Sequence, residues 1–189
     1  MQELDLTTIY DAAMRNFMAA ADILEALQAT RLDLLSEART GLVGRPRLGL
    51  GGGYNNVTPN FGACLPTNGR AEILSAEGGA GIELRGTGAE WMTLEGTLNT
   101  RAPAELCYVE MQATADRPLV ADLFLREFLD DGSVRDIGHQ ECHVETGNVA
   151  VCKLELPELA DDVTGRRIIA HLRQPASRII LDRLAVTLA

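Results

Sequence analysis

The first part of the chain, residues 4–36, has apolar residues at alternating steps of four and three. This is the heptad pattern of a helix that packs along another helix. Strong helix formers fill most of the segment, and residues 1–40 contain no Gly or Pro. The pattern therefore predicts a long N-terminal α-helix within residues 1–40. The seam is broken only by Arg31 and consists of Leu6, Tyr10, Ala13, Phe17, Ala20, Leu24, Leu27, Arg31 and Leu34.

Such a helix has two interpretations. It could pack along its own domain, or it could serve for oligomerisation or docking. A helix of about 30 residues is about 45 Å long, which exceeds the face of a small β domain. Part of its apolar stripe would then need a second chain to cover it. We therefore favour a coiled-coil or docking helix.

Residues 41–60 are rich in glycine and are predicted to form a linker or loop. The run Gly-Gly-Gly-Tyr-Asn-Asn lacks the Gly-Lys-Ser/Thr ending of a phosphate loop. Residues 61–189 change to short alternating runs of apolar and polar residues between turn residues, which indicates a β-sandwich domain. The predicted strands are 71–76, 81–86, 90–99, 104–114, 118–129, 134–145, 148–156, 166–174 and 178–188.

Three turns can be placed between these strands. Asp130-Asp131-Gly132 predicts a hairpin, and QPA at 174–176 predicts a second hairpin before the last strand. Thr146-Gly147-Asn148 predicts a third, with Gly147 at positive φ. That last hairpin would put Cys142 opposite Cys152. The two are either reduced core thiols or a disulfide, and a disulfide would need an oxidising environment.

The alternation also places individual polar residues. In 178–188, Asp182 shares a face with Ile180 and Leu184, which is the more apolar face of the strand. A carboxylate that faces a core must be paired, hydrogen-bonded or bound to a metal. In 119–129, the alternation changes near residues 126–128, which predicts a bulge or a strong twist in that strand.

Composition and charge limit the classes of partner that we expect for the chain. The 189 residues carry 27 acidic against 17 basic side chains, a formal net charge of −10. Such a surface repels phosphate backbones, so nucleic acid is not an expected partner. No apolar run reaches the about 18 residues of a membrane helix, so membrane insertion is not expected. The acidic N-terminus predicts a chain made in the cytoplasm without a signal peptide.

The order of long strands in residues 60–189 resembles the β jelly roll of carbohydrate-binding modules. The matching pieces are GAGIELRG, AEWMTLEGTL, LCYVEMQATA, PLVADLFLREFLDDGS, RRIIAHLR and SRIILDRLAVTL. In that family an Asp of the terminal strand often helps to bind a structural Ca²⁺, and Asp182 matches that position. The resemblance thus implies a structural Ca²⁺ site, with Asn60 or Glu72 as the candidates for a further ligand. Alternatively, Asp182 pairs with Arg173 or Arg178, or caps a loop amide.

A helix followed by a jelly roll is also similar to the plan of phage fibres and spikes and of the head spikes of gene transfer agents. That resemblance implies a docking helix followed by a glycan-binding sandwich. The chain would then act outside the cell as part of a particle. This plan rests on architecture alone.

Sugar binding requires an aromatic platform, because one face of a pyranose ring is apolar, and planar polar groups for its rim of hydroxyls. Tyr54 lies in the Gly/Asn loop, and Trp91 begins a strand. Polar residues of one predicted hairpin could supply the hydroxyl contacts. We find no assembled nucleophile or catalytic motif, and we read His139, His143 and His171 as surface or core-edge residues. The predicted carbohydrate site consists of Tyr54, Trp91, Arg126, Glu127, Arg135 and Gln140.

The sequence therefore predicts a mainly β protein, a jelly-roll β-sandwich preceded by a long N-terminal α-helix. The leading hypothesis is a non-enzymatic spike or attachment protein that binds cell-surface or capsular polysaccharide. It would form a homo-oligomer or join particle proteins through its helix. The alternatives are a structural decoration or assembly protein that binds no sugar, and an accessory domain of an enzyme complex.

Overall fold

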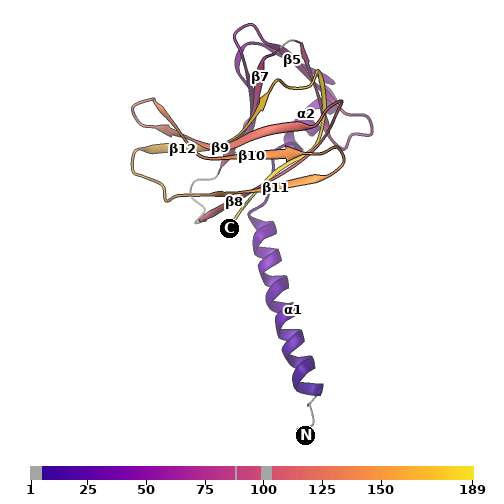
Figure 1. Ribbon diagram of the computed structural model, residues 1–189, viewed down its shortest axis with the longest axis vertical. Helices are drawn as coiled ribbons and strands as arrows, with labels where there is room; N and C mark the ends of the chain where they lie inside the picture. The colour runs from indigo at the N-terminus through magenta and orange to yellow at the C-terminus, as the bar shows by residue number, and fades with distance from the viewer. Residues whose placement is uncertain (1–5, 88, 99–103) are drawn as a thin grey trace.

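The computed structural model describes residues 6–87, 89–98 and 104–189. They form a sandwich of two antiparallel sheets, from which one long helix, α1 (Leu6–Ala29), extends (Figure 1). The predicted jelly-roll β-sandwich with an N-terminal helix is confirmed. The first sheet has the order β11 (Val149–Glu155), β8 (Leu106–Ala115), β13 (Arg178–Leu188), β6 (Ile82–Thr87), β5 (Arg70–Ser75) and β2 (Arg47–Leu50), with β1 (Leu32–Asp33) also pairing with β13. The second sheet has the order β10 (Val134–Val144), β9 (Leu119–Leu129), β12 (Val163–Arg173), β7 (Trp91–Leu98), β4 (Phe61–Leu65) and β3 (Gly53–Thr58).

The core lies between the two sheets and follows the period-two pattern of the strands. In the strands inside the sheets, alternate residues point inward and are nearly inaccessible to solvent. In β8 these are Cys107, Val109, Met111 and Ala113. All nine predicted strands are present, and their ends differ from the predicted ones by at most three residues.

The predicted linker at residues 41–60 is wrong, because most of it is regular structure. Helix α2 (Ser36–Gly44) occupies its start, and β2 and β3 add an edge strand to each sheet. The side-chain amide of Asn55 donates to the carbonyl oxygens of Gly51, at 2.7 Å, and Gly53, at 2.9 Å. Glycines and asparagines here form a tight turn between two edge strands rather than a flexible connection.

The predicted single helix is also too long. It ends at Ala29, and the chain then forms β1 and α2. The Thr30 hydroxyl donates to the carbonyl oxygen of Leu188 at 2.6 Å, which ties the end of α1 to the last strand. Leu34 and Leu35 are buried in the sandwich core. The last apolar residues of the heptad pattern therefore pack in the sandwich. The spacing of apolar residues predicts one face of a helix, but it does not say which partner covers that face.

The Asp130–Gly132 hairpin is confirmed, since β9 and β10 pair directly and Gly132 has a φ of 83°. The other two predicted hairpins are wrong. The chain crosses to the opposite sheet between β10 and β11 and again between β12 and β13. Alternation identifies a strand, but it does not say with which strand it pairs.

Cys142 and Cys152 consequently lie on strands of different sheets. Their cross-strand neighbours are Ala121 and Val109, not each other. Both side chains nevertheless point into the core, and both are free thiols. Burial and a hydrogen bond with the Cys152 thiol raise the pKa of Cys142 to about 12. The two sulfurs thus meet across the sandwich, and the disulfide stays a prediction.

Asp182 occupies a bulge in β13. The register shifts between Leu181 and Arg183, and Asp182 has no cross-strand partner in the pairing of β13 with β8. The shift exchanges the two faces, so Ile180 is half-buried on the outer face while Leu184 faces the core. The prediction that Asp182 faces the core is therefore wrong, since it is half-buried.

The neighbourhood of Asp182 does not match the predicted ligand sets. Arg173 pairs with Asp122, and Arg178 pairs with Glu83. The two guessed calcium ligands also have other partners: Asn60 contacts Glu37, and Glu72 contacts Arg47. Within the described ranges, no three or more His, Cys, Asp or Glu side chains gather in a way that could hold a metal ion. These residues do not fit a Ca²⁺ site of six to eight oxygens, and the calcium stays a prediction.

Candidate functional site

The outer face of the second sheet gathers aromatic and charged side chains in rows across its strands. Cross-strand pairing fixes these rows, because paired residues point to the same side of a sheet. One row continues from Tyr54 on β3 to Glu141 on β10, and the next continues from Asn56 to Phe124. The first row is Tyr54, Cys64, Thr93, His171, Asp122 and Glu141, and the second is Asn56, Gly62, Glu95, Ile169 and Phe124.

On this face, the Arg167 side chain contacts the rings of Tyr54 and Phe128. Its guanidinium carbon is 4.4 Å from the ring centroid of Tyr54 and 4.9 Å from that of Phe128, so both rings contact the cation. Its Nη1 donates to Glu95 at 3.0 Å, and Glu95 also accepts a hydrogen bond of 2.9 Å from Thr93. We call Tyr54, Arg167 and Phe128 the arginine platform. Burial of the Tyr54 ring raises the pKa of its hydroxyl, which stays protonated at neutral pH.

The space for the Tyr54 ring is provided by Gly62. A Cβ atom at Gly62 would lie 2.3 Å from the Tyr54 hydroxyl oxygen and 2.6 Å from the adjoining ring carbon. The ring therefore crosses directly over the backbone of β4. This close approach explains why the second row contains a residue without a side chain.

A second group of side chains lies beside the arginine platform, toward β10. The His139 ring stacks on Phe124 with 4.6 Å between centroids and 27° between planes. The Arg126 guanidinium lies 5.6 Å from the Phe124 ring and makes two hydrogen bonds of 2.7 Å to Asp136. His139 reaches Phe124 because the register shifts between Ile137 and Gln140, beside Gly138 with its φ of 70°.

A third group lies at the other end of the face. Trp91 meets the His171 ring edge to face, with centroids 5.9 Å apart. Asp122 is the cross-strand neighbour of His171 and pairs with Arg173. Burial lowers the pKa of His171, so its ring is neutral at pH 7. The Nε2 atom of His171 is buried without a hydrogen-bond partner among the described residues.

A hollow of about 350 Å³ opens beside the arginine platform. Phe128 and Arg167 form one side of it, and the lining is completed by Thr97, Leu98, Thr164, Gly165 and Arg166. Two hydroxyl groups, a guanidinium and an aromatic edge thus surround a space of small-ligand size. This arrangement can accept hydrogen bonds, donate them and contact an apolar ring.

The structure divides the six predicted carbohydrate-site residues between the two faces of the second sheet. Tyr54, Trp91 and Arg126 lie on the outer face, close to the groups just described. Glu127 and Arg135 pair with each other across β9 and β10 on the opposite side. Gln140 also points to that side, from an exposed position on the edge strand. The expectation of one continuous polar face from this hairpin is wrong, because neighbouring residues of a strand point in opposite directions.

Glu127 is part of a buried ion pair instead. Its side chain is 2% exposed and that of Arg166 is 5% exposed, with 2.6 Å between their charged atoms. Arg135 makes a second ion pair of 2.6 Å to the other carboxylate oxygen. The alternation of β9 continues through residues 126–128 without the predicted bulge, since Phe128 points outward under Arg167. A charged residue is tolerated at this core position because the Arg166 guanidinium pairs with the Glu127 carboxylate.

Sequence reasoning missed several residues of the outer face, including Glu95, Arg167 and Phe124. A signal for some of them was present. The polar residues Thr93, Glu95 and Thr97 alternate with Met92, Leu94 and Leu98, and this pattern marks β7 as having one polar face. Phe124 gave no such signal, because an aromatic residue beside a row of core leucines is usually assigned to the core.

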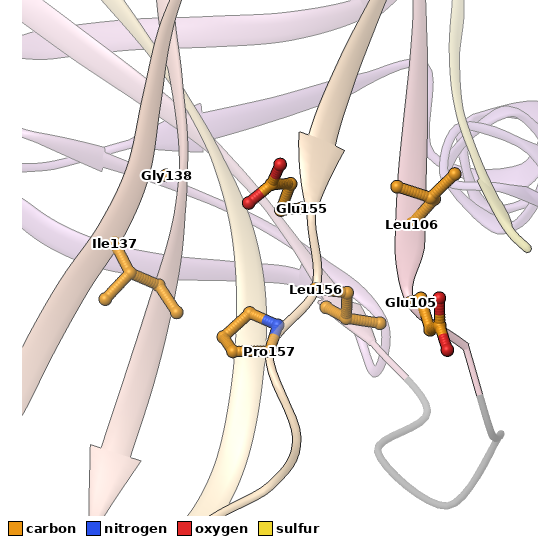
Figure 2. A pocket seen from close by; sticks show the side chains of 7 residues that line it. All are labelled: Glu105, Leu106, Ile137, Gly138, Glu155, Leu156 and Pro157. Carbon is orange, nitrogen blue, oxygen red and sulfur yellow. The ribbon is translucent and has the colours of Figure 1, made fainter.

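A second hollow, of about 470 Å³, opens at the rim between the two sheets. Figure 2 shows its lining, which comes from β8, β10 and β11 and from the segments at their ends. Two carboxylates, Glu105 and Glu155, lie among Leu106, Ile137 and Leu156. The lining contains no aromatic ring, and it lacks the paired arginines of the outer face. We therefore take the outer face of the second sheet as the candidate site.

No helix of the described residues is long and apolar enough to cross a membrane. No protein-family model matches the chain, and no curated protein matches it either.

The fold is shared with solved carbohydrate-binding modules. The chain is similar to the C-terminal family 22 module of Clostridium thermocellum Xyn10B, with 16% identity, 70% of this chain and 88% of that chain covered, and a TM-score of 0.46. The family 11 module of the same organism has 13% identity, coverage of 70% and 91%, and a TM-score of 0.46. The tandem family 22 modules of Paenibacillus barcinonensis Xyn10C have 10% identity, coverage of 69% and 45%, and a TM-score of 0.50. The strand pairing itself gives the two-sheet fold, and at 10% identity the likeness to the tandem modules bears on the fold alone.

Proposed function

We propose that the chain is a non-enzymatic carbohydrate-binding protein and that the outer face of the second sheet holds the polysaccharide. One observation carries this proposal: aromatic rings and planar polar groups lie together on a single sheet face. The apolar face of a sugar ring can stack on Tyr54 or Trp91. The guanidinium of Arg167 and the hydroxyls of Thr97 and Thr164 can meet the hydroxyl rim.

The charges of this face support binding rather than catalysis. Glu95, Asp122 and Asp136 each form an ion pair with an arginine of the same face. A glycosidase needs one carboxylic acid that can give up a proton and a second carboxylate across the bond. Each of these three carboxylates is instead engaged by an arginine side chain.

We further propose that α1 connects the sandwich to other copies or to a larger particle, so that the whole acts as a spike that attaches to cell-surface or capsular polysaccharide. The exposed apolar residues of α1 support this role: Tyr10, Phe17 and Leu24 are 65%, 73% and 66% exposed. These residues equally support the alternative of a decoration or assembly protein that binds no sugar. Sugar binding is therefore the property to test.

The test is a glycan array followed by affinity measurement on the best polysaccharide. Arg167→Ala removes the cation that both platform rings contact, and Tyr54→Ala removes one of those rings. Each variant is expected to weaken binding by tenfold or more, on the order of 1.4 kcal/mol. Arg85→Ala, an exposed arginine of the first sheet, is the matched control and should bind as the native chain does. Absence of retention on every neutral and acidic polysaccharide would leave only the assembly role.

A further inference from the structure

An apolar groove lies where α1 joins the sandwich. It has a volume of about 580 Å³ and lies between the last turns of α1 and the outer face of the first sheet. Leu24 and Leu27 line it from the helix, while Tyr108 on β8 and Val151 on β11 line it from the sheet. Val151 is 60% exposed. Figure 1 shows α1 leaving the sandwich beside β8 and β11.

The groove continues the apolar stripe of the helix. Tyr10, Phe17 and Leu24 follow one another at seven-residue spacing and therefore lie along one side of α1. Leu24 belongs both to this stripe and to the lining of the groove. The stripe and the groove are thus one surface, which begins on the helix and ends on the sheet.

The base of α1 is held in place, so the groove has a defined shape. Arg31 donates two hydrogen bonds to Glu110, of 2.9 and 3.1 Å, and Arg183 donates a third of 3.1 Å to the same carboxylate. The arginines hold the pKa of Glu110 below its usual value. Together with the hydrogen bond of Thr30 to the last strand, these contacts fix the end of the helix against the first sheet.

The charges around the groove are complementary to the helix itself. Lys153 is the only lysine of the chain. It lies two residues after Val151 on the same face of β11, is exposed, and has no ion pair with any described residue. The last turns of α1 carry the exposed acids Asp22 and Glu25 and no basic residue. An α1 helix placed in the groove would bring carboxylates to this lysine.

We infer that the groove receives the α1 helix of a second copy of this chain, in parallel orientation. Parallel packing of identical helices places equal residue numbers at equal heights, so the second copy's Asp22 and Glu25 come level with Leu24 and reach Lys153. The sheet face around Val151 then forms the floor of the interface. This inference rests on the proposed self-association through α1, and it adds that the sandwich takes part.

Carbodiimide cross-linking of the full-length chain tests the contact, because this reagent joins a lysine directly to a carboxylate that it touches. A mixture of unlabelled and ¹⁵N-labelled chains separates links between copies from links within one copy. We expect Lys153 linked to Asp22 or Glu25, in peptide pairs with one labelled and one unlabelled member. Lys153→Arg is the control and loses the link. Links within one copy only, or links to a different segment, would overturn the inference.

Two further variants separate this inference from helix association itself. Phe17→Glu tests the helix stripe and Val151→Glu tests the groove, with Val134→Glu as a control at an exposed valine of the other sheet. In sedimentation analysis, Phe17→Glu and Val151→Glu should each raise the dissociation constant about tenfold or more, because each places a charge in an apolar interface. If only Phe17→Glu dissociates the assembly, the helix associates without the groove and the inference fails. If the native chain is a monomer at all concentrations, self-association fails as well.

Discussion

The pair Glu127–Arg166 is the most strongly buried ion pair of the described residues, and its removal has a predictable cost. In Arg166→Met, the carboxylate oxygen Oε1 of Glu127 loses its guanidinium while remaining inside the protein. Breaking a buried pair in this way costs about 3–5 kcal/mol, because the remaining charge is neither paired nor hydrated. The other oxygen keeps its contact with Arg135, so we expect the lower end, about 3 kcal/mol.

The measurement is urea denaturation together with thermal melting. For a domain of this size, about 3 kcal/mol corresponds to a fall in Tm of about 6–12 °C. The control Arg135→Met removes a guanidinium that is 45% exposed. It should cost no more than about 1 kcal/mol, as an exposed ion pair does.

A double variant completes the test. Glu127→Leu with Arg166→Met replaces both charges by apolar groups and should recover most of the lost stability, because no unpaired charge then stays buried. The reasoning is refuted if Arg166→Met loses less than about 1 kcal/mol, or if the double variant is no better than the single one.

Four other predictions follow from particular contacts. Arg178 and Arg85 lower the pKa of Glu83 to about 2, so its contribution to stability is present above pH 4.5 and is lost as the pH falls toward 2; Glu83→Gln should flatten that part of a stability-against-pH curve. Gly62→Ala displaces the platform tyrosine and should weaken glycan binding severalfold while changing the free energy of unfolding by less than about 1 kcal/mol, and unchanged binding would contradict the platform. If Asp182 binds calcium, a chelator lowers the melting midpoint of the native chain but not that of Asp182→Asn; an unchanged midpoint in both removes the ion. Mild oxidation should join Cys142 to Cys152, detected as a linked peptide that alkylation does not modify, and free thiols after prolonged oxidation would exclude the bridge.

The sequence was sufficient for the elements that depend on local periodicity. Alternation identified the nine strands from β5 to β13, and the heptad pattern identified α1. The sequence was insufficient where the position of a residue depends on partners that are far away in the chain. Leu34 continues the heptad spacing but packs in the sandwich, and Asp182 breaks its own alternation by forming a bulge. The glycine-rich strands β2 and β3 have little apolar signal because they are edge strands.

The same distinction holds for the candidate site. Trp91, Tyr54 and Arg126 were chosen by residue type, and each lies on the outer face of the second sheet. Arg167 was not chosen, because its role depends on two rings that come from β3 and β9, far from it in the sequence. Glu127 was chosen as a ligand contact because it is charged. It lies in the core instead, because it pairs with Arg166, which is 39 residues away in the sequence.

The position of the last strand has a consequence for how the protein is made. β13 lies inside its sheet, between β8 and β6, and also pairs with β1. The first sheet cannot close until β13 has left the ribosome, and its many long-range pairings favour slow folding. Helix α1, in contrast, is synthesised first and needs only local hydrogen bonds to form. On a messenger RNA that carries several ribosomes, neighbouring nascent chains therefore present their apolar helices to one another well before any sandwich is complete.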